Sequence, residues 1–154
     1  MSLGLYLHIP YCFSKCRYCD FYSAPGQRGV PRAYVDALLR ELSRFAPDAP
    51  LRPNTLYFGG GTPSLLDPAD AARLIDAAQP LPGAEITLEA NPETVTEDSL
   101  RAFREAGVNR ISFGVQSARD SQLKTLGRPH TAKQARAAFS AARRAGFENI
   151  SGDI

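Results

Sequence analysis

Short apolar runs rich in β-branched and aromatic residues alternate along this chain with longer stretches in which apolar residues recur every three or four positions. The short runs indicate strands, and the longer spacing indicates helices with one apolar face. The runs predict five β-strands, at residues 5–9, 55–58, 86–89, 110–115 and 149–154. A helix is predicted in each gap between them.

Residues typical of helix starts and stops flank these amphipathic stretches. The expected helix starts are at Pro31, at Asp67 with Pro68, at Thr96, and at Thr131 with Gln134. The corresponding helices are expected to end before Pro47, at about residue 78, at Gly107 and at Gly146. Asp67 and Thr96 are N-cap candidates, because their side-chain oxygens can accept from backbone amides of the first turn. Thr131 and Gln134 have the spacing of a capping box.

Repetition of strand, helix and strand predicts parallel pairing, because each helix carries the chain back to the same edge with right-handed sense. The fold class is therefore α/β, and both a doubly wound sheet and a barrel satisfy the pattern. One module of helix end, turn and strand occurs twice, at 106–112 and 145–151. Ile154 lies inside the last predicted strand, so residues 1–154 are expected to form one domain whose C-terminal part is absent.

All three cysteines, Cys12, Cys16 and Cys19, lie within eight residues just after the first predicted strand. An odd, clustered set fits a metal site in a reducing compartment better than a disulfide framework. The irons of a [4Fe–4S] cluster are normally held by cysteine thiolates. A loop with three cysteines would leave the fourth iron open to another ligand.

Composition narrows the class of protein. With 154 residues, 44% hydrophobic and 22% charged, the chain is expected to bury an ordinary globular core. The net charge of +2 is scattered, which gives no electrostatic support for nucleic-acid binding. We expect a cytoplasmic protein without a transmembrane segment, because no signal-peptide pattern and no run near the roughly 20 apolar residues of a membrane span occurs.

Unusual polar residues and glycines follow or end the predicted strands. The cysteine loop follows the first strand, and Gly-Gly-Gly-Thr-Pro at 59–63 follows the second. Glu89 ends the third strand, Gln116 follows the fourth, and Asp153 lies late in the fifth. Ligands bind at the carboxyl ends of strands in parallel α/β folds, particularly in barrels. The sequence therefore predicts one site at this end of the sheet.

The cysteines and glycines also have plainer interpretations. The cysteines could be three small buried side chains, or they could bind zinc with His8 as the fourth ligand of a closed tetrahedron. His8 lies within the first strand, however, and is expected to point away from the loop. The glycine run could form only a tight turn, although glycines also let backbone groups approach a ligand closely.

The other polar residues have similar alternatives. Glu89 could pair with a neighbouring arginine or accept from the ammonium of a ligand, since an acid in a parallel strand is costly unless it is paired. Gln116 could bond only to solvent. Arg128 is expected in a loop, where most arginines are solvated, and His130 is expected on the surface.

Together these motifs resemble the radical S-adenosylmethionine superfamily. They are Cys12-x₃-Cys16-x₂-Cys19 after Tyr6-Leu-His8-Ile-Pro10, Gly59-Gly-Gly-Thr-Pro63, Glu89-Ala-Asn-Pro92 and Gly114-Val-Gln116. More narrowly, the chain is similar to the oxygen-independent coproporphyrinogen III oxidase group and its haem-chaperone relatives. The resemblance implies the N-terminal part of a partial (β/α)₆ barrel of the TIM type, with about four units and a fifth strand in this chain.

The resemblance implies that Cys12, Cys16 and Cys19 hold a [4Fe–4S] cluster whose fourth iron is chelated by the amino and carboxylate groups of S-adenosylmethionine. Contacts to this molecule are implied at Tyr6, Tyr18, Gly60 and Glu89. A second S-adenosylmethionine, as in the oxidase branch, is implied at Gly61, Thr62, Gln116, Arg128 and Asp153. In the implied chemistry, an electron donor reduces the cluster, one electron breaks a C–S bond of the sulfonium, and a 5′-deoxyadenosyl radical takes hydrogen from a substrate.

The two branches differ at one position of the loop. The porphyrinogen oxidases resemble Cys-x₃-Cys-x₂-Cys-x-Cys, whereas this chain is similar to the chaperone branch in having Phe21 at the last position. The resemblance therefore favours a haem chaperone that delivers haem to partners such as membrane-bound respiratory proteins. The alternative is an enzyme that oxidatively decarboxylates porphyrinogen propionates to vinyls. A zinc-stapled binding module is the non-catalytic alternative.

Overall fold

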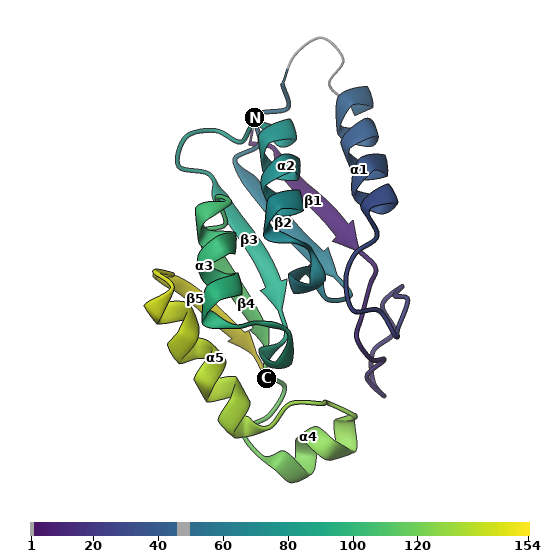
Figure 1. The fold of residues 1–154 in the computed structure, drawn as a ribbon, viewed down its shortest axis with the longest axis vertical. Helices are drawn as coiled ribbons and strands as arrows, with labels where there is room; N and C mark the ends of the chain where they lie inside the picture. Colours follow the sequence, from purple (N-terminus) through teal and green to yellow (C-terminus); the bar gives the residue numbers. More distant parts are fainter. Residues whose placement is uncertain (1, 46–49) are drawn as a thin grey trace.

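The computed structural model describes residues 2–45 and 50–154, and its centre is one parallel sheet (Figure 1). Neighbouring strands follow the order of the sequence, and every pair is parallel. The strands are β1 (Gly4–Ile9), β2 (Thr55–Gly60), β3 (Glu85–Ala90), β4 (Arg110–Gly114) and β5 (Asn149–Asp153). All five lie where the apolar runs predict them, with ends that differ by at most two residues.

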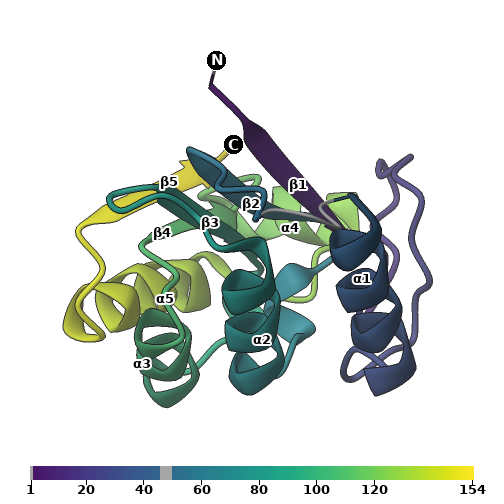
Figure 2. The same cartoon turned by 90° about the horizontal axis from the view of Figure 1, so that it is seen from above.

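The helices show which of the two α/β architectures is present. They are α1 (Arg32–Phe45), α2 (Pro68–Ala78), α3 (Glu97–Glu105), α4 (Asp120–Leu126) and α5 (Ala132–Arg144), with short 3₁₀ turns η1 (Pro63–Leu65) and η2 (Pro92–Thr94). Helices α1, α2, α3 and α5 all cover one face of the sheet (Figure 2). A doubly wound sheet carries helices on both faces, whereas a barrel carries them on the outside. The chain is α/β and consistent with a partial barrel.

The predicted helix caps are present. Asp67 Oδ1 accepts from the Ala69 backbone amide at 2.8 Å, and Pro68 occupies the first turn of α2. Thr96 and Thr131 each form a capping box with the residue three positions later. Pro47, expected just beyond α1, lies outside the described residues.

The sequence patterns do not predict α4. This helix has seven residues and a single buried side chain, Leu123, which is too little for a periodic pattern to be visible. Its local signals are Asp120 in the first turn and Gly127 at its C-terminal cap, where φ is +74°. A left-handed cap residue of this kind is usually glycine.

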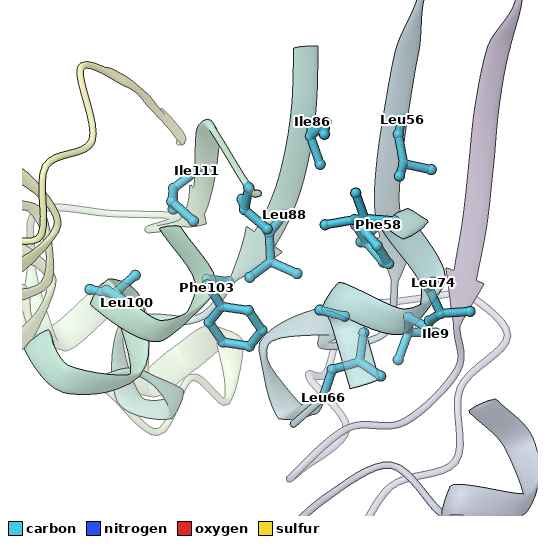
Figure 3. Close-up of a cluster of buried hydrophobic side chains, with 14 of the residues drawn as sticks. Ile9, Leu56, Phe58, Leu66, Leu74, Ile86, Leu88, Leu100, Phe103 and Ile111 are labelled. Atoms are coloured by element: carbon cyan, nitrogen blue, oxygen red, sulfur yellow. The ribbon is translucent and has the colours of Figure 1, made fainter. Parts of the chain in front are cut away.

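Alternate strand residues point to opposite faces of the sheet. The strand residues that face the helices belong to the buried core, which includes Ile9, Leu56, Phe58, Ile86, Leu88 and Ile111 (Figure 3). From the helices and their connections, the same core includes Leu66, Leu74, Leu100 and Phe103. The other face is polar, and the register places Glu89 beside Ser112 and Ser112 beside Ser151. Parallel strands buried on both faces are apolar throughout, so this alternation leaves one polar face for a site.

No helix in the described part of the chain has both the length and the apolar composition needed to cross a bilayer.

Candidate metal and cofactor site

One cavity of about 310 Å³ collects almost all of the predicted site residues. Its lining includes Cys12, Cys16, Tyr18, Cys19, Gly60, Gly61, Thr62, Glu89, Gln116, Arg128 and Asp153. These residues come from the loop after β1 and from the carboxyl ends of the other strands, together with the segment that follows α4. The prediction that the features at the strand ends meet in one place is confirmed.

Tyr6 is the one predicted site residue that does not line this cavity. It lies on β1, 53% exposed, and its hydroxyl is 3.2 Å from His8 Nδ1. Its ring stacks on Tyr57 with centroids 6.0 Å apart. Partial burial, and to a smaller extent the charge of Glu89, raises the pKa of Tyr6. Tyr6 therefore lies beside the site rather than inside it.

The cysteine loop is held at its two ends by backbone hydrogen bonds. The Cys12 amide donates to the Ala24 carbonyl at 3.0 Å, and the Ala24 amide donates to the Pro10 carbonyl at 2.6 Å. Inside the loop, Lys15 Nζ donates to the Phe21 carbonyl at 2.7 Å. All three cysteines are free thiols; Cys12 is buried, and Cys16 and Cys19 are half-buried. The loop therefore does not contain three buried structural cysteines.

The three thiols fit an iron–sulfur cluster better than a single ion. Among residues 2–45 and 50–154, no three His, Cys, Asp or Glu side chains converge as ligands of one metal ion. A tetrahedral zinc ion needs four ligands at about 2.0–2.3 Å from one centre. In a cluster each thiolate binds a different iron, so sulfurs that share a cavity without converging on a point suit it.

His8 does not complete a zinc site, but the expectation that it points away from the loop is wrong. Its Nε2 donates to the Tyr22 carbonyl at 3.2 Å, and its Nδ1 accepts from the Tyr6 hydroxyl. A Cβ at Gly60, where φ is +118°, would lie 2.6 Å from the imidazole Cε1. The ring therefore packs between β2 and the end of the loop, with both nitrogens engaged by groups other than the cysteines.

The glycine run after β2 forms a turn, and its backbone also packs closely against the cysteine loop. The Gly61 amide donates to the Ile9 carbonyl at 2.9 Å, and the Thr62 amide donates to the Tyr11 carbonyl at 2.8 Å. A Cβ at Gly61 would lie 2.8 Å from the Tyr11 carbonyl oxygen and 2.9 Å from Cys12 Sγ. Glycine at this position lets Cys12 lie against the end of β2.

Gly61→Ala is expected to lower the free energy of unfolding by about 1–3 kcal/mol, the usual cost of forcing extra atoms into a packed site. The loop carbonyls and Cys12 would have to move away from β2 to make room. Urea unfolding measures the loss. Gly29→Ala is the matched control, because its Cβ would lie 3.9 Å from the nearest atom at an ordinary φ. Equal stability of the two variants would contradict the tight packing at Gly61.

Glu89 is held by a hydroxyl and an amide. Its Oε1 accepts from the Tyr57 hydroxyl at 2.8 Å, and its Oε2 accepts from the Gly60 amide at 3.1 Å. The alternative of an arginine salt bridge is wrong for the described residues, since none of their ion pairs includes Glu89. A carboxylate has about four lone-pair positions. Two are left for a cationic group in the cavity.

Tyr57 keeps its proton under strongly alkaline conditions. Burial, reinforced by the hydrogen bond to Glu89 and the charge of Glu89, holds the pKa of Tyr57 well above its ordinary value. Below pH 10, folded and unfolded chains both carry this proton, so its contribution to stability is fully present. Above pH 10 the unfolded chain releases the proton while the folded chain retains it, so stability falls as pH rises.

Tyr57→Phe is therefore expected to weaken the loss of stability between pH 9 and pH 11. Urea unfolding at several pH values in this range measures the slope. Tyr22→Phe, at a side chain that is 84% exposed, is the matched control for removing a phenol. A slope for Tyr57→Phe as steep as that of the unaltered chain would contradict the link between Tyr57 and Glu89.

The segment after β4 turns sharply into the cavity. Gln116 has a φ of +67°, and its backbone amide donates to the backbone carbonyl of Asp153 at 2.7 Å. Non-glycine residues with positive φ are uncommon, and they cluster at functional sites. The Gln116 residue lines the cavity.

Arg128 and His130 are more tightly held than the sequence suggests. Arg128 Nη1 donates to Cys16 Sγ at 3.3 Å, so this arginine is not merely solvated. The expectation that His130 lies on the surface is wrong, because its side chain is fully buried. Its Nδ1 lies 3.1 Å from Glu93 Oε2, and its Nε2 donates to the Val115 carbonyl at 3.0 Å.

Asn91 is a lining residue that the sequence reasoning did not single out. Its Nδ2 donates to Thr62 Oγ1 at 3.1 Å, and its Oδ1 accepts from Arg128 Nη2 at 2.6 Å. The sequence does carry a signal for it, because Asn91 directly follows β3, at the end of the strand where ligands bind in parallel α/β folds. Asn91 joins the turn after β2 to the segment after α4.

Comparison with known proteins agrees with this geometry. The family model "Radical SAM superfamily" matches residues 6–154. Heme chaperone HemW of Escherichia coli (strain K12) is 44% identical over 158 residues, covering 99% of this chain and 42% of that relative. Heme chaperone HemW of Bacillus subtilis (strain 168) is 37% identical over 155 residues, covering 97% and 41%. The chain thus spans about two fifths of the length of these relatives.

A solved structure supports the same assignment. The coproporphyrinogen III oxidase HemN from Escherichia coli, described as a radical SAM enzyme, matches with a TM-score of 0.87 and 32% identity, covering 99% of this chain and 36% of that chain. The chain belongs to the radical SAM superfamily, and this membership implies S-adenosylmethionine and a [4Fe–4S] cluster as its cofactors.

Proposed function

We propose that this chain is the cofactor-binding part of a haem chaperone. The observation that carries the proposal is that three free thiols line one cavity together with Glu89 and the glycine run. The relatives named Heme chaperone HemW support the haem assignment, since they match nearly the whole chain. Delivery of haem to partner proteins, including respiratory ones, belongs to the same proposal.

The thiolates of Cys12, Cys16 and Cys19 would each bind one iron and leave the fourth iron without a protein ligand. When bound and reduced, the cluster supplies the electron that cleaves the sulfonium of S-adenosylmethionine. The chain holds the loop in place from both ends and places Cys12 against β2. The cofactors perform the difficult chemistry, while these residues bind, orient and shield them.

Glu89 would accept from the ammonium of S-adenosylmethionine, and the Gly60 backbone and Tyr18 would contact the same molecule. Tyr6 would contribute from its place beside the cavity. Charge-assisted hydrogen bonds are stronger than neutral ones, so the Glu89 contact is expected to dominate. A second S-adenosylmethionine would be bound by the remaining lining residues, Gly61, Thr62, Gln116, Arg128 and Asp153.

Phe21 favours the chaperone over the porphyrinogen oxidase. It lines the cavity and is 66% exposed, at the position where the oxidases carry a further cysteine. Tyr18 and Tyr22 nearby are 48% and 84% exposed. Exposed aromatic rings beside a cavity suit contact with a flat apolar macrocycle. The alternative, oxidative decarboxylation of a porphyrinogen, is favoured by the structural match to coproporphyrinogen III oxidase.

Anaerobic assay of the full-length protein separates the two functions. The protein is loaded with cluster, reduced and incubated with S-adenosylmethionine and either haem or coproporphyrinogen III, with the Escherichia coli oxidase as positive control. Haem binding without formation of protoporphyrinogen is the expected result. Turnover of coproporphyrinogen would establish the oxidase, and absence of both haem binding and turnover would contradict the proposal.

A further inference from the structure

Four residues lie between α4 and Thr131, the N-cap of α5: Gly127, Arg128, Pro129 and His130. Two of their side chains reach consecutive carbonyls at the end of β4. Arg128 Nη2 donates to the Gly114 carbonyl at 2.6 Å, and His130 Nε2 donates to the Val115 carbonyl at 3.0 Å. We call these four residues the 127–130 turn. It fixes the chain just before the positive-φ residue Gln116.

Both side chains also reach other parts of the site. Arg128 Nη2 donates to Asn91 Oδ1 at 2.6 Å, and His130 Nδ1 lies 3.1 Å from Glu93 Oε2, so the turn is joined to the connection between β3 and α3. Arg128 Nη1 donates to Cys16 Sγ at 3.3 Å. One guanidinium therefore joins the cysteine loop to the ends of β3 and β4.

The backbone around the turn holds the same loop. The Arg17 amide donates to the Leu126 carbonyl at 3.1 Å, at the last residue of α4. A Cβ at Gly127 would lie 3.1 Å from Arg17 Cγ. The middle of the cysteine loop thus lies against the end of α4, next to the arginine that contacts Cys16.

One donor of this guanidinium has no acceptor. Among the described residues, Arg128 Nε is the buried side-chain nitrogen or oxygen left without a hydrogen-bond partner. A buried donor without an acceptor costs about 1–3 kcal/mol, so each such group calls for an explanation. The acceptors that fix this guanidinium are therefore those of its two Nη groups, which are Cys16 Sγ, Asn91 Oδ1 and the Gly114 carbonyl.

We propose that Arg128 is a positioning residue of the metal centre, which holds the Cys16 thiolate and stabilises negative charge on its sulfur. The inference rests on the proposed function, since it requires a cluster on Cys16. Hydrogen bonds to cluster sulfurs and nearby charge set the reduction potential. A cationic donor favours the reduced cluster, which carries one more negative charge, so Arg128 raises the potential.

The test compares Arg128→Met with Arg136→Met in anaerobically reconstituted protein. Arg136 is an exposed arginine on α5, and the substitution makes the same change of charge away from the site. The midpoint potential is measured by redox titration followed by electron paramagnetic resonance. Arg128→Met is expected to shift the reduction equilibrium about tenfold toward the oxidised cluster, which is about 59 mV for one electron. Arg136→Met is expected to leave it unchanged.

The outcomes separate this inference from the proposed function. Iron and acid-labile sulfide in the unaltered protein are measured first, and their absence would overturn the cluster itself. A folded Arg128→Met protein with less iron supports the role in holding Cys16, whereas full iron content with an unchanged potential overturns the inference. If Arg128→Met does not fold, Arg128→Gln decides, because glutamine removes the charge while its side-chain amide can still donate to a neighbouring acceptor. An unchanged potential in that variant overturns the inference.

Discussion

Cys16→Ala is expected to lower the iron and acid-labile sulfide content of anaerobically reconstituted protein by more than about tenfold. Losing a residue that only hydrogen-bonds to a metal ligand typically lowers metal affinity 10–100-fold. This substitution removes a metal ligand itself. Cys16 is half-buried, and its sulfur accepts from Arg128. It is not among the residues of the hydrophobic core, so the substitution leaves that core unchanged. The fold is therefore expected to survive the loss of the cluster.

Ser14→Ala is the control for Cys16→Ala. Ser14 lies in the same loop and lines the same cavity, but it offers no thiolate. Both variants are expected to keep the far-ultraviolet circular dichroism of the unaltered protein, and only Cys16→Ala is expected to lose iron. Full metal content in Cys16→Ala would show that the loop does not hold the metal in the manner proposed.

Glu89→Gln is expected to raise the dissociation constant for S-adenosylmethionine by about 10–100-fold in cluster-loaded protein. Hydrogen bonds to charged groups contribute about 1.5–3 kcal/mol, and each 1.4 kcal/mol is a factor of ten in affinity. Glutamine keeps the size of the side chain and one acceptor oxygen for Tyr57 or Gly60. The variant therefore removes the negative charge with little other change.

Glu85→Gln makes the same substitution at the other end of β3, on an exposed residue outside the cavity lining. Isothermal titration calorimetry with S-adenosylmethionine is expected to give the affinity of the unaltered protein for this control. If Glu89→Gln bound as tightly as the control, the ammonium contact would be excluded, and Glu89 would have only the structural role of holding Tyr57 and the Gly60 amide.

The strands and most helices could be predicted because their signals are local. Ile86 and Leu88 mark β3 by their alternation with polar residues, and Thr131 with Gln134 marks the start of α5 within four positions. The convergence of the site also followed from the sequence, because the carboxyl ends of parallel strands share one edge. The pattern of strands and helices alone did not choose between a barrel and a doubly wound sheet, because the choice depends on which face the helices cover. The family resemblance predicted the barrel, and the helices on one face of the sheet agree with it.

The environments of Arg128 and His130 could not be predicted, because their partners are distant in the sequence. Cys16 is 112 positions from Arg128, and Glu93 is 37 positions from His130. No pattern within a window of residues contains such pairs. Tyr6 shows the opposite case, where a motif pointed to the cavity and the structure places the side chain beside it.

The most direct test of the central claim is a Mössbauer spectrum of protein reconstituted with ⁵⁷Fe, recorded without and with S-adenosylmethionine. The claim is that three cysteines hold a [4Fe–4S] cluster and leave one iron for this cofactor. The expected result is a cluster spectrum in which one of the four irons changes when S-adenosylmethionine is added. A spectrum without a cluster, or one in which all four irons are unaffected, would contradict the claim.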